Sequence, residues 1–356
     1  MSIPVLPGIT ASAITSARIT TRVLFSGPED GIPVLFIHGN ASSATYWEET
    51  MLALPAGYRG IAPDQRGYGD ADRAKKIDAT RGMGDLADDA FALLDALQIK
   101  RAHVVGHSMG GSVIWRMMAD APERIISVTL AAPGSPFGFG GSKGANGEMC
   151  YADGAGSGGG IVNPTFTQMM AAGERGSDNP QASPRVVMNS FYWKPPFKAV
   201  REEELLSSLL SEHVGPQEYP GDSVPSANWP GLAPGKFGPA NALAPLYAGD
   251  VMAVTRIAVK PAVLWIRGAD DQIVSDTSLF DMGTLGAFGA VPGWPGADVF
   301  PSQPMVSQTR YVLDAYQANG GQYQEIVLAE TGHTPYIEKP EAFNAAFHAH
   351  LAAHSS

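Results

Sequence analysis

The sequence predicts an α/β protein with a mostly parallel central sheet, helices on both faces of that sheet and a large insertion. Two observations predict the sheet. Short, uninterrupted apolar runs are typical of strands that are buried on both faces, and they alternate with segments whose apolar residues recur at helical spacing. The insertion is predicted by a long stretch in which this alternation stops before it resumes.

The first part of the chain contains four of the predicted strands, at residues 34–37, 58–63, 102–105 and 125–131. A helix is expected between the second and third of them, because Leu86, Ala90 and Leu93 fall on one helical face. Its aspartates, which include Asp88, Asp89 and Asp95, are expected on a solvated face. Another helix is expected over residues 111–119.

The insertion, residues 134–258, is rich in glycine and proline and has one strong helical pattern, near residues 201–210. Aromatic residues occur throughout it, and a solvated linker has little use for them. We therefore predict a cap that packs over the rest of the protein. Some of its aromatic residues are expected to line a substrate pocket, with Phe137, Phe139, Tyr192 and Trp193 as candidates.

After the insertion the sheet pattern resumes with strands at residues 261–267 and 323–328, and with helices at 305–318 and from Pro340 onward. A second irregular segment, residues 283–304, is expected to cover the same opening as the first insertion. The predicted organisation is a core made of residues 1–133 and 259–356, with residues 134–258 as the cap.

The most informative motif is Gly106-His107-Ser108-Met109-Gly110, which lies between a predicted strand and a predicted helix. A strand, a tight turn with a serine between glycines, and a helix together indicate a nucleophile elbow. The chain is crowded in such a turn, so the positions two before and two after the serine cannot carry bulk. The turn would expose the Ser108 hydroxyl and direct the Met109 backbone N–H toward a developing oxyanion.

Two further chemical groups follow later strands, namely the pair Asp270 and Asp271, and His333. Parallel strands place their carboxyl ends at one edge of the sheet, so these groups can meet Ser108. A serine hydroxyl needs a base to remove its proton, and an imidazole base needs a carboxylate to orient it. Ser, Asp and His in this order predict nucleophilic acyl transfer.

On these motifs the sequence resembles the α/β-hydrolase family. The resemblance covers about residues 31–133 and 260–350 and not the insertion. Besides the elbow, it rests on His38-Gly39, on Asp64-Gln-Arg-Gly-Tyr-Gly, on Gly268-x-x-Asp271, and on Gly332-His333 with Glu338-Lys-Pro340 after it.

The resemblance implies that Asp271 is the acid, with Asp270 as the alternative. It also implies that the backbone N–H groups of Asn40 and Met109 form the oxyanion hole. His38 is expected to brace the oxyanion loop, and His107 is expected to pack or to be exposed rather than to act. Asp64 and Arg66 are expected to form a structural ion pair or a turn near the site.

The expected function is that of a serine hydrolase, a carboxylesterase that acts on esters with a hydrophobic part. The same three residues would also serve a lipase, lactonase, amidase, carbon–carbon bond hydrolase or perhydrolase. A ligand-binding receptor on this fold is the non-enzyme alternative. No metal or organic cofactor is expected for any of these reactions.

The composition bears on the partners of the protein, on disulfide formation and on its location in the cell. The formal charge of −11 argues against nucleic-acid or anionic membrane partners, and the single cysteine, Cys150, excludes an internal disulfide. No segment approaches eighteen uninterrupted apolar residues, and no signal peptide is visible, so no stable membrane association and a cytoplasmic location are expected. The sequence does not predict an oligomeric state.

Overall fold

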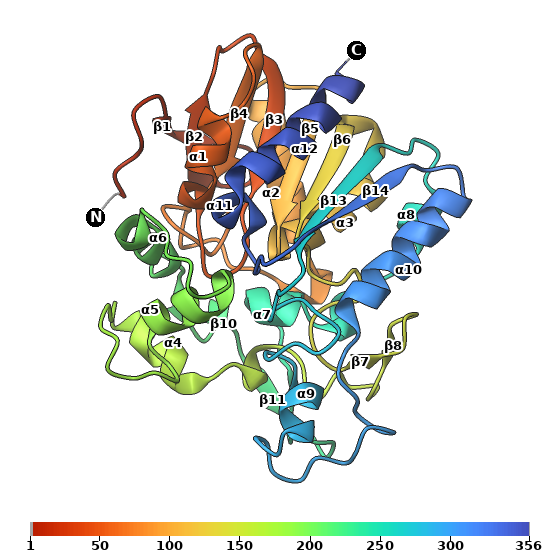
Figure 1. Cartoon of the computed structure of the whole chain (residues 1–356). Coiled ribbons are helices and arrows are strands. Elements are labelled where there is room, and N and C mark those ends of the chain that lie inside the picture. Colours follow the sequence, from red (N-terminus) through yellow and green to blue (C-terminus); the bar gives the residue numbers. More distant parts are fainter. Residues whose placement is uncertain (1–2, 356) are drawn as a thin grey trace.

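The computed structural model describes residues 3–355 and is built around an eight-stranded sheet in the order β1-β2-β4-β3-β5-β6-β13-β14 (Figure 1). The strands of this sheet are β1 (Thr10–Thr15), β2 (Thr20–Ser26), β3 (Ile32–Ile37), β4 (Tyr58–Pro63), β5 (Ala102–His107), β6 (Ile125–Ala131), β13 (Ala262–Gly268) and β14 (Tyr323–Leu328). The six strands from β4 to β14 in this order are parallel, as predicted.

The helices are α1 (Glu48–Leu52), α2 (Gly84–Ala96), α3 (Met109–Asp120), α4 (Pro164–Ala171), α5 (Pro184–Val187), α6 (Glu202–Leu209), α7 (Pro239–Ala242), α8 (Ala253–Arg256), α9 (Met282–Ala287), α10 (Met305–Ala318), α11 (Pro335–Glu338) and α12 (Pro340–His354). Single helical turns also occur, among them η1 (Ala44–Trp47) and the π-helical η5 (Met188–Tyr192). Among the described residues, no helix is long and apolar enough to cross a bilayer.

Strands β1 and β2 were not predicted. β1 pairs with β2 and β2 pairs with β4, both in antiparallel fashion, so the two strands form one edge of the sheet. The sequence of β1, Thr-Ala-Ser-Ala-Ile-Thr, has no apolar run, and nearly all of the strand is exposed. Its extended conformation is therefore set by hydrogen bonding to β2 rather than by burial of its own side chains.

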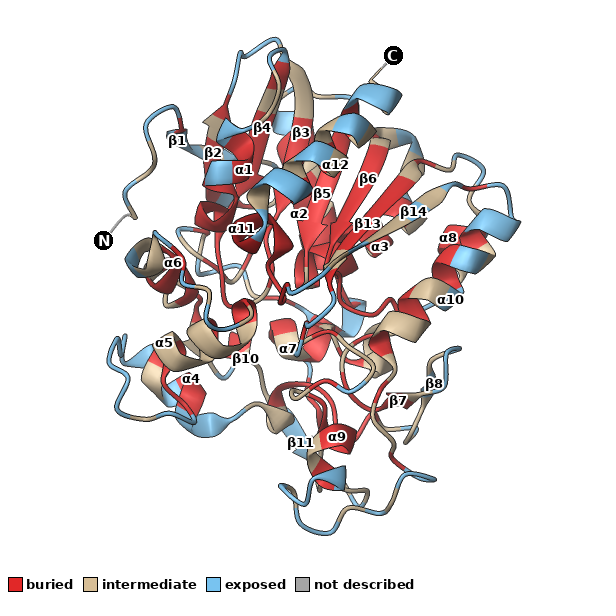
Figure 2. Cartoon of the chain, in the orientation of Figure 1, coloured by how far each residue is buried: buried red, intermediate tan, exposed pale blue. Residues whose placement is uncertain are grey.

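Two apolar layers hold the helices against the sheet, one on each face, and Figure 2 shows the buried strands between helices whose outer sides are exposed. One layer joins the sheet to α1, α11 and α12 through Met51, Tyr336 and Phe347. The other joins it to α2, α3, α8 and α10, for example through Leu313. Both faces of the sheet are thus covered, as the uninterrupted apolar strands predict.

The segment from residue 134 to 258 lies over the carboxyl ends of the parallel strands (Figure 1). It contributes no strand to the central sheet within residues 3–355; its strands form separate two-stranded ladders, β7 (Ser142–Lys143) with β8 (Glu148–Met149), β9 (Val214–Gly215) with β10 (Tyr219–Pro220), and β11 (Ser223–Pro225) with β12 (Leu232–Pro234).

The insertion is bonded to the loops at these strand ends and to the second irregular segment, 283–304. Ser43 Oγ and Ser208 Oγ lie 2.6 Å apart, and Gly140 N–H donates to Gln303 Oε1 at 2.6 Å. The two insertions therefore pack against each other above one edge of the sheet. The division of the chain into a core and a cap stays a prediction.

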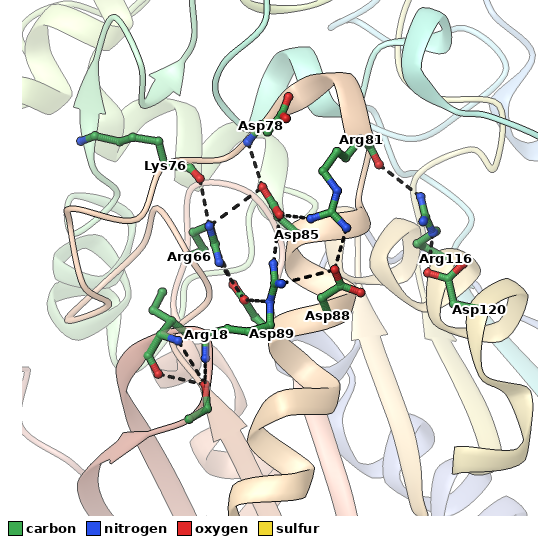
Figure 3. Close-up of polar contacts among 12 residues, drawn as sticks. Arg18, Arg66, Lys76, Asp78, Arg81, Asp85, Asp88, Asp89, Arg116 and Asp120 are labelled. Carbon is green, nitrogen blue, oxygen red and sulfur yellow. Dashed lines mark hydrogen bonds and ion pairs between the residues drawn. The ribbon is translucent and has the colours of Figure 1, made fainter.

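A network of ion pairs ties the N-terminal strands to the loop after β4 and to α2 (Figure 3). Asp89 accepts from Arg18 Nε at 2.7 Å and from Arg66 at 2.7 and 2.8 Å. Placing Asp89 on a solvated face was wrong, since it is buried between these two arginines. A helical pattern shows which side carries the apolar residues, and it does not show which carboxylates meet arginines from distant segments.

Asp64 and Arg66 do not pair with each other. Asp64 accepts from Arg22 Nε at 2.9 Å and from Arg22 Nη2 at 3.2 Å, while Arg66 turns the other way, to Asp89. Both ion pairs are nevertheless structural, because each joins the loop after β4 to another element.

Replacing Asp89 with asparagine should lower the free energy of unfolding by about 3 kcal/mol, because two partly buried guanidinium groups lose their carboxylate. The matched control is Asp95→Asn, since Asp95 is exposed and pairs with Arg124 at 2.6 Å near the surface. That change should stay within about 0.5 kcal/mol. Urea unfolding measures both variants; equal effects would contradict the structural role of Asp89.

Candidate active site

Ser108 lies in the turn between β5 and α3 and has a strained backbone, with φ +53° and ψ −118°. The flanking glycines permit this turn. A Cβ atom on Gly106 would lie 2.5 Å from the Gly110 carbonyl oxygen, and one on Gly110 would lie 2.2 Å from the Ile37 carbonyl oxygen. The steric reason predicted for both glycines is therefore confirmed. Ser108 itself is half-buried at the end of the sheet.

His333 and Asp271 form a buried hydrogen bond in which His333 Nδ1–H donates to Asp271 Oδ2 at 2.8 Å. The other carboxylate oxygen of Asp271 accepts the backbone N–H groups of Ile273 and Val274 at 2.8 and 2.9 Å. These bonds fix the orientation of the carboxylate toward the imidazole. The alternative acid, Asp270, is exposed and instead lies 3.1 Å from Lys194 Nζ.

The backbone on each side of His333 is held by residues for which the sequence did not predict this role. Gly332 N–H donates to Glu338 Oε2 at 2.6 Å, and His107 Nε2–H donates to the His333 carbonyl oxygen at 2.8 Å. Thr334 N–H donates to the Tyr192 carbonyl oxygen at 2.8 Å. His107 is thus more than packing, because it anchors the loop that carries His333.

Ser108 and His333 are brought to the same edge of the sheet through His107. The ring of His107, the neighbour of Ser108, lies with its centroid 4.7 Å from that of His333. Within residues 3–355, no hydrogen bond joins Ser108 Oγ to the imidazole of His333. Of the two contacts expected among Ser108, His333 and Asp271, the structure therefore contains the hydrogen bond between His333 and Asp271. Bonds to a reacting hydroxyl commonly tighten only when substrate is bound.

The backbone N–H groups of Asn40 and Met109 have no acceptor among the described residues. The side chains of these two residues are linked by Tyr68, whose hydroxyl donates to Asn40 Oδ1 at 2.7 Å and lies 3.3 Å from Met109 Sδ. A Cβ atom on Gly39, the residue before Asn40, would lie 3.1 Å from Ser108 Cβ. Two unpaired donors therefore flank the serine, an arrangement that suits an oxyanion.

His38 braces this loop, as expected. Its Nδ1–H donates to the Gly39 carbonyl oxygen at 2.8 Å, and its Nε2 accepts the Gln65 N–H at 3.0 Å. The second bond requires Nε2 to be unprotonated. Complete burial lowers the pKa of His38 to about 4, so the ring is neutral near pH 7.

The aromatic candidates occupy two different regions. Tyr192 and Trp193 lie at the site, since the Tyr192 hydroxyl donates to the Ala41 carbonyl oxygen at 2.9 Å and the Trp193 backbone packs against Gly332. Phe137 instead lies beside Tyr311 of α10, with ring centroids 6.4 Å apart, and the Phe139 N–H donates to Leu243 O at 2.7 Å. Their roles in substrate binding stay predictions.

The neutral His38 makes stability sensitive to acid. Its pKa is lower in the folded state than in the unfolded state, so stability is complete above about pH 6.5 and falls as pH drops toward about 4. Between about pH 7.5 and 5, this residue should account for a loss of about 2 kcal/mol. His38→Gln, which keeps an acceptor for Gln65, should show a correspondingly smaller loss in urea unfolding at the two pH values. An unchanged pH dependence would contradict the assignment.

Residues 32–142 match the family model described as alpha/beta hydrolase fold. Over 132 residues, the chain is 33% identical to the AB hydrolase superfamily protein YfhM of Bacillus subtilis, which covers 36% of this chain and 46% of that protein. Over 105 residues, it is 42% identical to the putative carbamate hydrolase RutD of Variovorax paradoxus, which covers 29% of this chain and 39% of that protein. The chain thus matches less than half the length of each of these relatives.

Among solved structures, the carboxylesterase CesB of Bacillus subtilis superposes with a TM-score of 0.58 at 14% identity, over 99% of this chain and 93% of that one. At this identity the likeness concerns the fold alone, and it extends over the insertion as well as the sheet. Strand order, the strained serine turn and the family match lead to the same conclusion. The chain has the α/β-hydrolase fold, and its residues 32–142 match the family model of that name.

Proposed function

We propose that this chain is a serine hydrolase that cleaves carboxylic esters of hydrophobic substrates through an acyl-enzyme intermediate. The observation that carries the proposal is the buried bond of 2.8 Å between His333 and Asp271 at the sheet edge where the strained turn presents Ser108. An oriented imidazole beside a serine hydroxyl is what nucleophilic acyl transfer requires.

In the first half of the proposed reaction, Ser108 Oγ attacks the carbonyl carbon of the ester while His333 Nε2 takes the hydroxyl proton. The imidazolium that forms is stabilised by Asp271, which stays ionised. The oxygen of the tetrahedral intermediate accepts hydrogen bonds from the Asn40 and Met109 N–H groups. The intermediate collapses to the acyl-enzyme, and His333 gives its proton to the leaving alcohol.

In the second half, water replaces the alcohol. His333 takes a proton from the water as the oxygen attacks the acyl carbon, and the same two N–H groups bind the new oxyanion. When the intermediate collapses, the bond to Ser108 Oγ breaks and the serine recovers its proton from His333. The carboxylic acid product then leaves. Each oxyanion donor typically contributes about 3–4 kcal/mol to stabilising the transition state.

The hydrophobic part of the substrate is proposed from the insertion. The buried Tyr192 side chain reaches the loop that carries Ala41, and the backbone of the buried Trp193 packs against the loop that carries His333. An apolar wall beside a small set of polar groups suits an uncharged ester. CesB, which shares the fold, is named a carboxylesterase, and RutD is named a carbamate hydrolase, so the acyl class needs a direct test.

Ser108→Ala should lower kcat for p-nitrophenyl esters by at least about 10⁴-fold, because the nucleophile is removed. A fluorophosphonate should label Ser108 in the wild-type protein, as located by mass spectrometry of peptides. Esters of several chain lengths, lactones and amides are compared in the same assay. Near wild-type turnover by Ser108→Ala would refute the proposal, and a single turnover without repetition would favour a receptor.

Asp271→Asn should lower kcat by about 10⁴-fold, because an amide leaves the imidazole in the wrong tautomer. The matched control is Asp270→Asn, whose side chain points to Lys194 and should keep nearly all activity. The reverse result would assign the acid to Asp270.

A further inference from the structure

Glu212 is a buried acidic residue that the proposed mechanism does not use. It lies in the turn after α6 and is 4% exposed. The turn is fixed to the loop after β4 by two backbone hydrogen bonds, from His213 N–H to Gly67 O at 2.9 Å and from Gly69 N–H to Ser211 O at 3.1 Å. These bonds hold the backbone of the insertion around Glu212 against the loop after β4.

The surroundings of the Glu212 carboxyl are polar but uncharged. The Tyr68 hydroxyl and the Ala41 backbone N–H lie near it, and Tyr192 and Tyr219 are close enough to feel its charge. Neither carboxyl oxygen has a hydrogen-bond partner among the described residues, and in that part of the chain no Lys, Arg or His forms an ion pair with Glu212.

Glu218, six residues further on, is a carboxylate of the same segment that does have positively charged partners. Its oxygens lie 2.7 Å from Arg73 Nη2 and 2.6 Å from Lys76 Nζ, and these cations lower the pKa of Glu218 to about 2. Glu212 has no such partners, and burial raises its pKa well above the ordinary value. A buried carboxyl without a countercharge is far more stable in its neutral form.

A neutral carboxyl has one hydrogen to donate, and the Tyr68 oxygen is a free acceptor for it. Tyr68 uses its own hydrogen in the bond of 2.7 Å to Asn40 Oδ1, which leaves its oxygen lone pairs available. A hydrogen bond from the neutral Glu212 carboxyl to the Tyr68 oxygen would complete a chain of donors from Glu212 through Tyr68 to Asn40. Such chains strengthen each bond within them and fix the side chains that they join.

We propose that Glu212, as a neutral acid supplied by the insertion, is a positioning residue that acts through Tyr68 to hold Asn40 and its backbone N–H in the geometry that binds the oxyanion. This inference rests on the proposed function. It extends that function by making the oxyanion hole depend on the insertion. An ionised Glu212 would also repel the tetrahedral oxyanion, so the neutral form is the one that supports catalysis.

The central experiment compares two variants of similar size. Glu212→Gln keeps a neutral donor for Tyr68 and should retain kcat within threefold. Glu212→Leu removes the donor and should lower kcat 10- to 100-fold with KM changed less than threefold, because ground-state binding does not use the oxyanion hole. The inhibition constant of an alkyl boronic acid, which forms a tetrahedral adduct with a serine, should rise by the same factor.

Two further variants separate positioning from folding. Tyr68→Phe removes the middle of the chain and should reproduce the kcat loss of Glu212→Leu. Glu218→Gln disturbs the ion pairs of the same segment and should lower the thermal unfolding midpoint while leaving kcat unchanged. Wild-type kcat in both Glu212→Leu and Tyr68→Phe, or an equal loss in Glu212→Gln and Glu212→Leu, would overturn the proposal.

The neutral state of Glu212 has a readout that does not involve turnover. Its pKa is higher in the folded state, so its contribution to stability is complete below about pH 4.5 and is lost as pH rises toward the folded pKa. The urea midpoint of Glu212→Gln should therefore rise relative to wild type between pH 4.5 and 8. A difference in urea midpoint that does not change with pH would contradict a neutral Glu212. If the wild-type protein failed to react with fluorophosphonate, the serine hydrolase proposal would be refuted, but the pH dependence of stability would still show a neutral Glu212.

Discussion

The hydrogen bond between His333 and Asp271 is the interaction on which the proposed chemistry depends, and it depends in turn on a short loop being held in place. Glu338 binds the N–H before His333, and His107 binds the carbonyl of His333 itself. His107 is also the residue next to Ser108, so one imidazole connects the turn that carries the serine to the loop that carries the proposed base. The two loops are therefore joined by buried contacts.

The insertion is part of this arrangement rather than a separate cover. The backbone carbonyl oxygen of Tyr192 accepts a hydrogen bond from the Thr334 N–H, and the Tyr192 hydroxyl donates one to the Ala41 carbonyl oxygen. One insertion residue thus touches the loop of the proposed base and the loop of the proposed oxyanion donors. Because the insertion bonds to both loops, it helps to hold the proposed reacting groups in place.

The buried carboxyl groups of this protein differ in whether they have an arginine partner. Asp64 and Asp89 pair with arginines from distant segments of the chain, and these ion pairs connect the sheet to the elements around it. Glu212 receives none and lies among tyrosines. The difference has a physical basis, since a paired charge can be stable in a buried place while an unpaired one is driven to its neutral form. Only the second kind has a proton to donate beside the oxyanion loop.

The parallel strands, the terminal helix and the strained turn around Ser108 could be predicted from the sequence, because each of these follows from local patterns of apolar residues and glycine. The sequence did not determine β1, whose strand conformation comes from pairing, nor the burial of Asp89. The tertiary structure alone brought Glu212, Tyr68 and Asn40 together. They lie up to 172 residues apart in the sequence (212 minus 40). No local sequence pattern predicts that they are neighbours, because contacts between distant segments depend on how the whole chain packs.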